Sequence, residues 1–353
     1  KIISRKSDLA IIQAKLVGKS ISRSNPSLSI EYLYKDTKGD IDLTTPLSKL
    51  PEIGVFTSDL RESLIENDAD IAVHSWKDLP IKLEKGTSVV GTLPRADMRD
   101  VLLVKKNKID SIKKNKLIKI SSSSPRRSYN ISAFLNKAVP FDLNEISFKD
   151  IRGNIPTRLN KFISDESDGI VLAKAALDRI LENSDKDLKQ KIISILNETL
   201  WMVLPLSKNP CAPAQGAIAI EVKDDSDKII KLIQNINDVD TYNNVIIERS
   251  TLEEFGGGCH QKIGVSNEKT SFGDIFTIRG ITDENTVLNT RKINRQNENE
   301  NFWREINEDN IFPLNLESYN FFTRKEIRKN ISEVSKLKNH NILATRSNVL
   351  DDI

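Results

Sequence analysis

Short apolar runs that alternate with helix-period segments constrain the fold of this 353-residue chain more than any other feature. Residues 2–3 and 70–73 read as buried strands, and residues 9–17 between them place their apolar side chains on one helical face. The middle third repeats the plan with apolar runs at 117–120 and 169–173. Strands that alternate with helices are typical of α/β folds. We therefore predict an α/β protein with two similar halves.

Polar side chains follow the predicted strands at the points where the strands end. Arg5 and Ser7 come after the first run, and Lys77 and Asp78 come shortly after the run at 70–73. In open α/β sheets the carboxyl ends of the strands form the edge where ligands bind. The sequence therefore predicts a ligand site at this edge.

Arginines recur at or near turns, whereas the more numerous lysines are spread along the chain. The arginines at these turns are Arg5, Arg99, Arg126, Arg127, Arg152 and Arg158. The rigid fork of arginine binds carboxylates bidentately, which favours it where several carboxylates must be held. A single exposed arginine is ordinary, and the serines at 121–124 could equally cap a helix. Together these residues indicate a small polyanionic ligand.

Asp78 is the strongest catalytic candidate. It is flanked by Lys77 and followed by Pro80, so its carboxylate can be presented where it stabilises a developing cation. A structural turn aspartate is the alternative. We expect His74 to be structural, paired with a backbone group or carboxylate, and Cys211 to serve packing.

Three glycines at 256–258 precede Cys259, one of only two cysteines. Consecutive glycines order at a high entropic cost, so they fit a place where backbone passes close to something bulky. A cofactor bonded to the Cys259 sulfur would be such an object, and a surface loop with an incidental thiol is the alternative. Around this loop we predict a helix with Ile246, Ile247 and Leu252 on it, later strands, and a loop or weak helix at 295–310.

Composition excludes several classes of function. Lys and Arg total 53 against 50 acidic residues, a formal charge of +3, which argues against a broad nucleic-acid-binding surface. No apolar run approaches the roughly 20 residues of a membrane span. Two cysteines and three histidines predict neither a disulfide framework nor a zinc site, and so favour the reducing cytoplasm.

Five segments, in this order, resemble the porphobilinogen deaminase (hydroxymethylbilane synthase) family. They read SRKSDLA at 4–10, HSWKDLP at 74–80, SSPRR at 123–127, RGNIPTRL at 152–159 and GGC at 257–259. The resemblance implies two periplasmic-binding-protein-like lobes with mixed sheets and a smaller α+β third domain that carries the cofactor cysteine. The implied boundaries are 1–95 with 215–236, then 98–210, then 238–320, followed by an extension at 321–353.

The resemblance also implies an activity. The family condenses four porphobilinogen molecules head to tail, with release of ammonia, on a dipyrromethane cofactor, and frees hydroxymethylbilane. By match, Cys259 would hold the cofactor through a thioether, and Asp78 would stabilise the positive azafulvene formed as ammonia leaves. The matched cofactor-binding residues are Lys77, Ser123, Ser124, Arg126 and Arg127. The matched substrate-binding residues are Arg5, Ser7, Arg99, Arg152 and Arg158, and no metal is implied.

Some positions depart from the family pattern. In the segment at 51–60, Ile53 and Ser58 replace two lysines, from which we expect weaker turnover or substrate affinity unless Lys49 substitutes. Gln261 and Lys262 stand where a proline usually follows the cysteine.

The sequence also suggests a partner enzyme and an alternative function for the chain. Residues 341–347 are similar to the opening strand of uroporphyrinogen-III synthase, which predicts a fused or associated partner of that kind. The competing function is a binding module, whose two lobes close on a small anion without chemistry. The glycine loop with Cys259 favours the enzyme, because a binding lobe needs no tethered cysteine.

Overall fold

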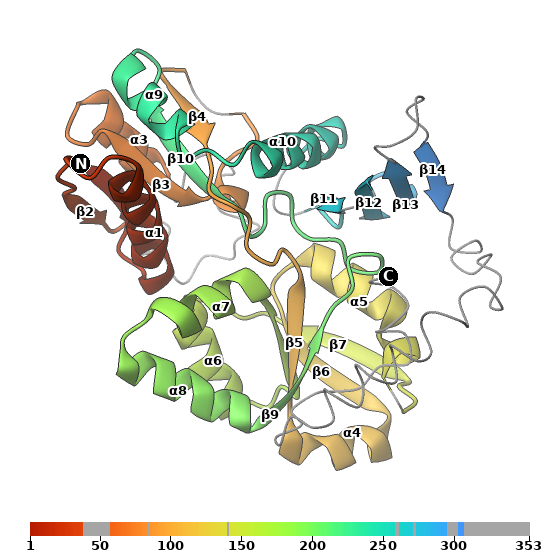
Figure 1. The fold of residues 1–353 in the computed structure, drawn as a ribbon. Helices are drawn as coiled ribbons and strands as arrows, with labels where there is room; N and C mark the ends of the chain where they lie inside the picture. The colour runs from red at the N-terminus through yellow and green to blue at the C-terminus, as the bar shows by residue number, and fades with distance from the viewer. Residues whose placement is uncertain are drawn as a thin grey trace, which may run out of the picture.

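A computed structural model describes residues 1–37, 57–82, 85–139, 141–257, 261–270, 273–294 and 303–306 (Figure 1). At 294 and 303–306 it describes the backbone alone. Cys259, the segment around Ile53 and the predicted features at 325–347 lie outside these residues.

The first sheet has the strand order β2-β1-β3-β10-β4. The first three strands are parallel, whereas β10 is antiparallel to both of its neighbours, so the sheet is mixed. The strands are β1 (Ile2–Arg5), β2 (Tyr32–Lys35), β3 (Ile71–Ser75), β4 (Thr87–Gly91) and β10 (Ile218–Lys223). The helices are α1 (Asp8–Ser24), α3 (Ser58–Ile65) and α9 (Asp227–Gln234). We call this sheet with its helices the first lobe.

Strand β1 is buried on both faces, which explains its apolar residues at 2–3. Successive side chains of a strand point to opposite faces. Ile2 packs with Val17 of α1, while its neighbour Ile3 packs with Leu60 and Leu64 of α3. A strand covered by helices on both faces reads as a continuous apolar run.

The second sheet has the order β7-β6-β8-β5-β9 and is also mixed. Its strands are β5 (Asp100–Lys105), β6 (Leu117–Ser121), β7 (Glu145–Lys149), β8 (Gly169–Ala173) and β9 (Thr199–Val203). Its helices are α4 (Ile109–Asn115), α5 (Pro125–Ala138), α6 (Ile155–Ser164), α7 (Lys174–Asn183) and α8 (Lys186–Asn197). This is the second lobe. The predicted α/β class with two mixed sheets is confirmed.

The third unit is an antiparallel sheet of β11 (Gly264–Thr270), β12 (Gly273–Ile281), β13 (Val287–Asn294) and β14 (Trp303–Ile306), packed beside α10 (Val239–Glu254) (Figure 1). The loop or weak helix predicted across 295–310 is wrong at 303–306. This strand pairs in register with β13, Arg291 opposite Ile306, and such long-range pairing leaves little trace in a polar local sequence.

The helix predicted through Ile246, Ile247 and Leu252 is α10, and its apolar residues do not all lie on its buried side. Ile246 and Ile247 are 44% and 43% exposed, whereas Glu248 and Arg249 are buried. The buried positions keep a helical spacing, but two of them carry charges whose partners lie elsewhere in the chain. The apolar residues alone therefore do not indicate the buried face of this helix.

Candidate active site

The turn after β3 presents Lys77 and Asp78. This turn is a short 3-10 helix, Trp76–Asp78, closed by a hydrogen bond from Leu79 N to Trp76 O of 3.2 Å. Trp76 and Leu79 are buried and anchor it, while Trp76 N donates to Ala217 O. Between these anchors Lys77 is half-buried and Asp78 is exposed. We call residues 76–81 the aspartate turn.

Charged side chains of the second lobe influence this turn. Burial lowers the pKa of Lys77, Asp78 raises it, and Arg127 and Arg158 lower it. Burial together with Arg127 and Arg152 lowers the pKa of Arg158 to about 10, against the opposing effect of Asp78. Such mutual shifts require the charges to be close. The fold therefore brings residues 77 and 78 of the first lobe to the arginines of the second.

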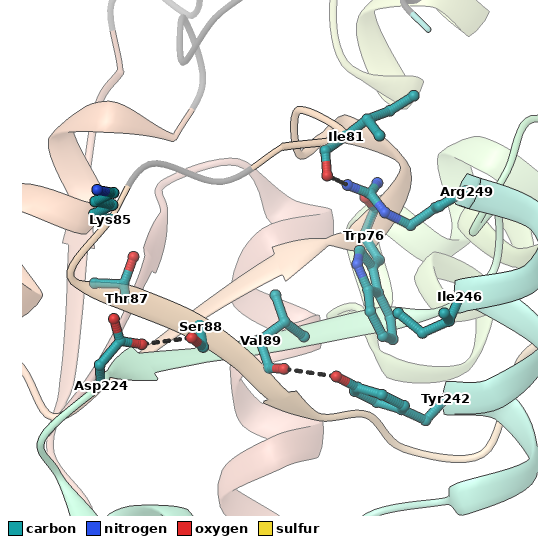
Figure 2. Close-up of a pocket in the computed structure, with 10 residues that line it drawn as sticks. All are labelled: Trp76, Ile81, Lys85, Thr87, Ser88, Val89, Asp224, Tyr242, Ile246 and Arg249. Atoms are coloured by element: carbon teal, nitrogen blue, oxygen red, sulfur yellow. Dashed lines mark hydrogen bonds between the residues drawn. The ribbon is translucent and has the colours of Figure 1, made fainter. Parts of the chain in front are cut away.

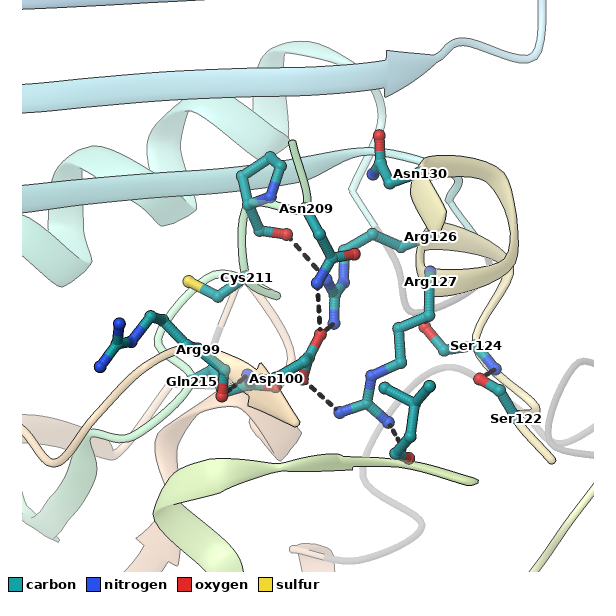
Figure 3. A network of polar contacts seen from close by, with 12 residues as sticks. Arg99, Asp100, Ser122, Ser124, Arg126, Arg127, Asn130, Asn209, Cys211 and Gln215 are labelled. Carbon is teal, nitrogen blue, oxygen red and sulfur yellow. Dashed lines mark hydrogen bonds and ion pairs between the residues drawn. The ribbon is translucent and has the colours of Figure 1, made fainter. Parts of the chain in front are cut away.

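Arg126 and Arg127 lie in the first turn of α5 and both bind Asp100 (Figure 3). Arg126 Nη2 and Arg127 Nη2 lie 2.8 Å and 2.7 Å from its two carboxylate oxygens. Burial raises the pKa of Asp100, but the two arginines outweigh it and hold that pKa well below its usual range. Sequence reasoning missed Asp100, because a lone aspartate at the start of a strand carries no local signal of two arginine partners.

The predicted serines join the two helices that carry the arginines. Ser123 Oγ donates to Ile151 O at 2.9 Å and accepts from Ile151 N at 2.8 Å. Ser124 is the N-cap of α5 and accepts from Arg127 N. These bonds fix the start of α5 next to the segment that leads into α6.

The remaining predicted binders occupy turns, as the sequence indicated. Arg5 ends β1, and Ser7 precedes α1 without a capping hydrogen bond from its side chain. Arg152 precedes α6 and contributes to the pKa of Arg158. Arg99 is ion-paired with Asp97, its Nη2 lying 2.9 Å from Oδ2.

The glycine loop begins against the aspartate turn. Gly257 has φ +68°, and a Cβ atom there would lie 2.8 Å from Ile81 Cδ1. Gln261 Nε2 donates to Phe255 O at 2.6 Å and so joins the two ends of the loop. The predicted close approach of the backbone is confirmed at Gly257, where the bulky neighbour is a side chain of the turn that carries Asp78.

Comparisons with known proteins identify the family. A family model described as porphobilinogen deaminase, dipyromethane cofactor binding domain, matches residues 1–231. The chain belongs to the porphobilinogen deaminase family. The porphobilinogen deaminase of Prochlorococcus marinus is 34% identical over 268 residues, covering 76% of this chain and 78% of its own. That of Caldicellulosiruptor saccharolyticus is 36% identical over 265 residues, covering 75% of this chain and 83% of its own.

Solved structures give a weaker likeness. A periplasmic sulfonate-binding protein of Methylobacillus flagellatus aligns with a TM-score of 0.36 at 13% identity, covering 72% of this chain and 70% of that one. A score at that level does not define a shared fold.

As a porphobilinogen deaminase, the chain is a transferase that condenses four porphobilinogen molecules, with loss of ammonia, into hydroxymethylbilane on a dipyrromethane cofactor. The residues present fit a group with several carboxylates. Lys77 interacts electrostatically with Arg127 and Arg158, and Arg158 also with Arg152. Arg127 Nε is buried without a hydrogen-bond partner among the described residues. An orphaned buried guanidinium nitrogen is costly unless a ligand satisfies it.

Two other expectations for this porphobilinogen deaminase are confirmed. His74 Nε2 lies 2.9 Å from Glu221 Oε2, so it is paired with a carboxylate. Cys211 is fully buried, and burial raises the pKa of its thiol, which suits packing and not reactivity.

Two kinds of feature are absent from the part of the chain that the structure describes. No group of three or more His, Cys, Asp or Glu side chains there could hold a metal ion. None of the helices that the structure describes has the length and apolar character needed to cross a membrane.

Proposed function

We propose that Asp78 is the catalytic residue of this porphobilinogen deaminase and that Cys259 carries its cofactor. The observation that carries the proposal is the electrostatic interaction of Lys77 with Arg127 and Arg158 of the other lobe, and of Asp78 with Arg158. An exposed carboxylate inside a cationic cluster can oppose a positive charge on a substrate whose own carboxylates the cations bind.

The chemistry of one cycle follows from this arrangement. The substrate's methylene–nitrogen bond breaks, and ammonia leaves with the bonding electrons. The Asp78 carboxylate stabilises the positive charge left on the pyrrole. When bound, dipyrromethane supplies the pyrrole α-carbon to which the first substrate unit is joined. This nucleophilic α-carbon would exchange its proton for the new carbon–carbon bond to the substrate's methylene.

We propose that the cationic side chains divide the carboxylates between them. The carboxylates of the cofactor would be held by Lys77, Arg126 and Arg127, together with Ser123 and Ser124. The buried Arg127 Nε, which has no hydrogen-bond partner among the described residues, supports this assignment. The carboxylates of the incoming substrate would be held by a second set of side chains: Arg5, Ser7, Arg99, Arg152 and Arg158. Since each condensation adds two carboxylates, a large excess of positive charge is required.

The test combines intact-mass measurement with product formation. Per molecule that carries cofactor, Asp78→Asn lowers formation of hydroxymethylbilane about 100-fold or more, because the stabilising charge is lost. Cys259→Ala shows neither the added cofactor mass nor product. Asp68→Asn, an exposed aspartate of the same lobe, behaves as the wild type.

Two results would overturn this proposal. Near-normal product formation by Asp78→Asn refutes the role of Asp78. A wild-type mass equal to the bare sequence, after incubation with porphobilinogen, refutes attachment at Cys259.

We further propose the domain division at 1–95 with 215–236, 98–210 and 238–320, which the three sheets support. The unpaired, buried Cys211 supports a reducing compartment, the cytoplasm. The proposed link to uroporphyrinogen-III synthase rests on the sequence at 341–347 alone. Expression of the natural transcript as a single chain with both activities would establish it, and a transcript that ends at Ile353 would exclude a fusion.

A further inference from the structure

Arg249 of α10 binds four backbone carbonyls of the aspartate turn. Its Nη1 donates to Trp76 O at 3.4 Å and to Leu79 O at 3.2 Å. Its Nη2 donates to Pro80 O and to Ile81 O at 3.1 Å, the last contact drawn in Figure 2. The side chain is 8% exposed. One buried guanidinium thus spans the turn on both sides of Asp78.

Apolar contacts tie the same turn to the same helix. Ile81 packs in a cluster with Leu252 and Phe255 at the end of α10 and with Ile263 and Val265 of the third unit. Gly257 comes next and lies against Ile81. The aspartate turn belongs to the first lobe by sequence, yet it is held by the helix that leads into the glycine loop.

Glu248, the neighbour of Arg249, anchors α10 in the other direction. Its carboxylate is fully buried and accepts from Arg95 Nη1 at 2.7 Å, Ala214 N at 2.8 Å and Asn267 N at 2.7 Å. These donors come from the segments between the lobes and from β11. The helix is therefore fixed before it reaches the turn, so Arg249 holds the turn from a rigid support.

We propose that Arg249 is the positioning residue for Asp78: it sets the aspartate turn relative to the loop that carries Cys259. The inference rests on the proposed roles of those two residues. Arg249 acts through the backbone and not on the substrate. The pocket of about 370 Å³ that it lines is walled by Trp76, Val89, Tyr242 and their neighbours, and by none of the residues assigned to cofactor or substrate (Figure 2).

The side-chain type is specific to this task. The four carbonyls are spread along the aspartate turn, so they need donors on two separate nitrogens. The planar guanidinium has N–H groups on both terminal nitrogens, whereas the donors of an ammonium group all lie on one nitrogen. Gln supplies a single donor group, and so it releases most of the turn. Misplacement of a catalytic group by about 1 Å can cost about 100-fold in rate.

The first experiment compares Arg249→Gln with the wild type. We expect kcat, per cofactor-bearing molecule, to fall about 100-fold while KM changes little, since the carboxylate binders are untouched. Hydrogen–deuterium exchange of peptide 76–82 becomes faster, a readout that does not depend on activity. Arg179→Gln is the matched control: Arg179 is also buried and donates to a backbone carbonyl, Gly216 O, but does not touch the turn.

A double-mutant cycle separates this inference from the proposed function. If Arg249 acts through Asp78, Arg249→Gln costs little further rate in an Asp78→Asn background. A full additional loss there, or unchanged exchange of peptide 76–82, overturns the role of Arg249. Near-normal activity of Asp78→Asn alone overturns instead the role of Asp78. If Arg249→Gln does not fold, Arg249→Lys carries the same readouts, with a smaller loss expected.

Discussion

Arg158 keeps its positive charge in surroundings that oppose it. Burial and the neighbouring guanidinium groups lower its pKa to about 10, and Asp78 offsets this only in part. At neutral pH the side chain is still charged, so it carries unfavourable electrostatic free energy that a bound carboxylate relieves. Burial lowers the pKa of Lys77 as well.

Replacing Arg158 should therefore weaken substrate binding. Arg158→Gln removes a charge-assisted hydrogen bond worth about 1.5–3 kcal/mol, so we expect KM for porphobilinogen to rise about 10-fold or more. Steady-state kinetics measure this effect. Lys189→Gln, an exposed cation on α8, is the control. An unchanged KM would remove Arg158 from the substrate site.

The sequence indicated the charged residues of the proposed site but not the residues that hold them in place. Asp78 and the arginines lie in local patterns that can be read directly. Asp100 is 26 residues from Arg126, and Arg249 is 169 residues from Pro80, so their roles depend on the finished fold. A buried polar network leaves no periodicity in the sequence, because each member is defined by its partner.

At the scale of elements, strand β10 is held in the first sheet by one buried carboxylate. Glu221 accepts from Arg61 Nε of α3 at 3.0 Å and from Thr87 Oγ1 of β4 at 2.6 Å, and it pairs with His74 of β3. Burial raises the pKa of Glu221, but His74, Thr87 and Arg61 together lower it from 4.5 to about 2. Three elements therefore depend on its charge.

This pKa predicts how stability changes in acid. The folded-state pKa is depressed, so the stabilisation is complete above about pH 4.5 and is lost as pH falls through about 2. Between these limits, the free energy of unfolding of the wild type should fall by about 1.4 kcal/mol per pH unit. Glu221→Gln lacks this contribution, so its free energy of unfolding should fall less by that amount. Urea unfolding at pH 4, 3.5 and 3 measures the two slopes. Glu62→Gln, exposed on α3, should match the wild type, and equal slopes for all three proteins would contradict the prediction.

A strong apolar run such as that of β8 could be read from the sequence, since its side chains are buried on both faces. The face of α10 and the existence of β14 could not. Glu248 and Arg249 are buried because partners from other elements satisfy them, and a local pattern treats charged residues as solvent-facing.

At the scale of the whole molecule, the two lobes are joined by two adjacent segments. Ala96 N donates to Gly216 O, and Gln215 Nε2 donates to Met98 O and to Asp100. Helix α1 also reaches the second lobe, because Ile12 packs with Leu177 and Ile180 of α7. The crossing at Gly216 is tight: its φ is +86°, and a Cβ atom would lie 2.5 Å from Ala96 O.

Gly216→Ala should therefore destabilise the protein through both backbone strain and a clash. Gly86→Ala is the matched control, since Gly86 has φ +103° but nothing within 4 Å of the added carbon. We expect Gly86→Ala to cost about 1 kcal/mol and Gly216→Ala clearly more. Urea unfolding of both variants measures the difference. Equal losses would show that the crossing relaxes around the methyl group.

The place of β10 in the first sheet has a consequence for synthesis on the ribosome. The strands β1 to β4 are made first, but β10 lies between β3 and β4, and the entire second sheet is encoded before it. At about 5–20 residues per second, the edges of β3 and β4 wait on the order of ten seconds for their partner. The second lobe is continuous in sequence and can complete its sheet during that time. The amino-terminal lobe is thus the later one to close, and its open edges are the part of the nascent chain that most needs protection from aggregation.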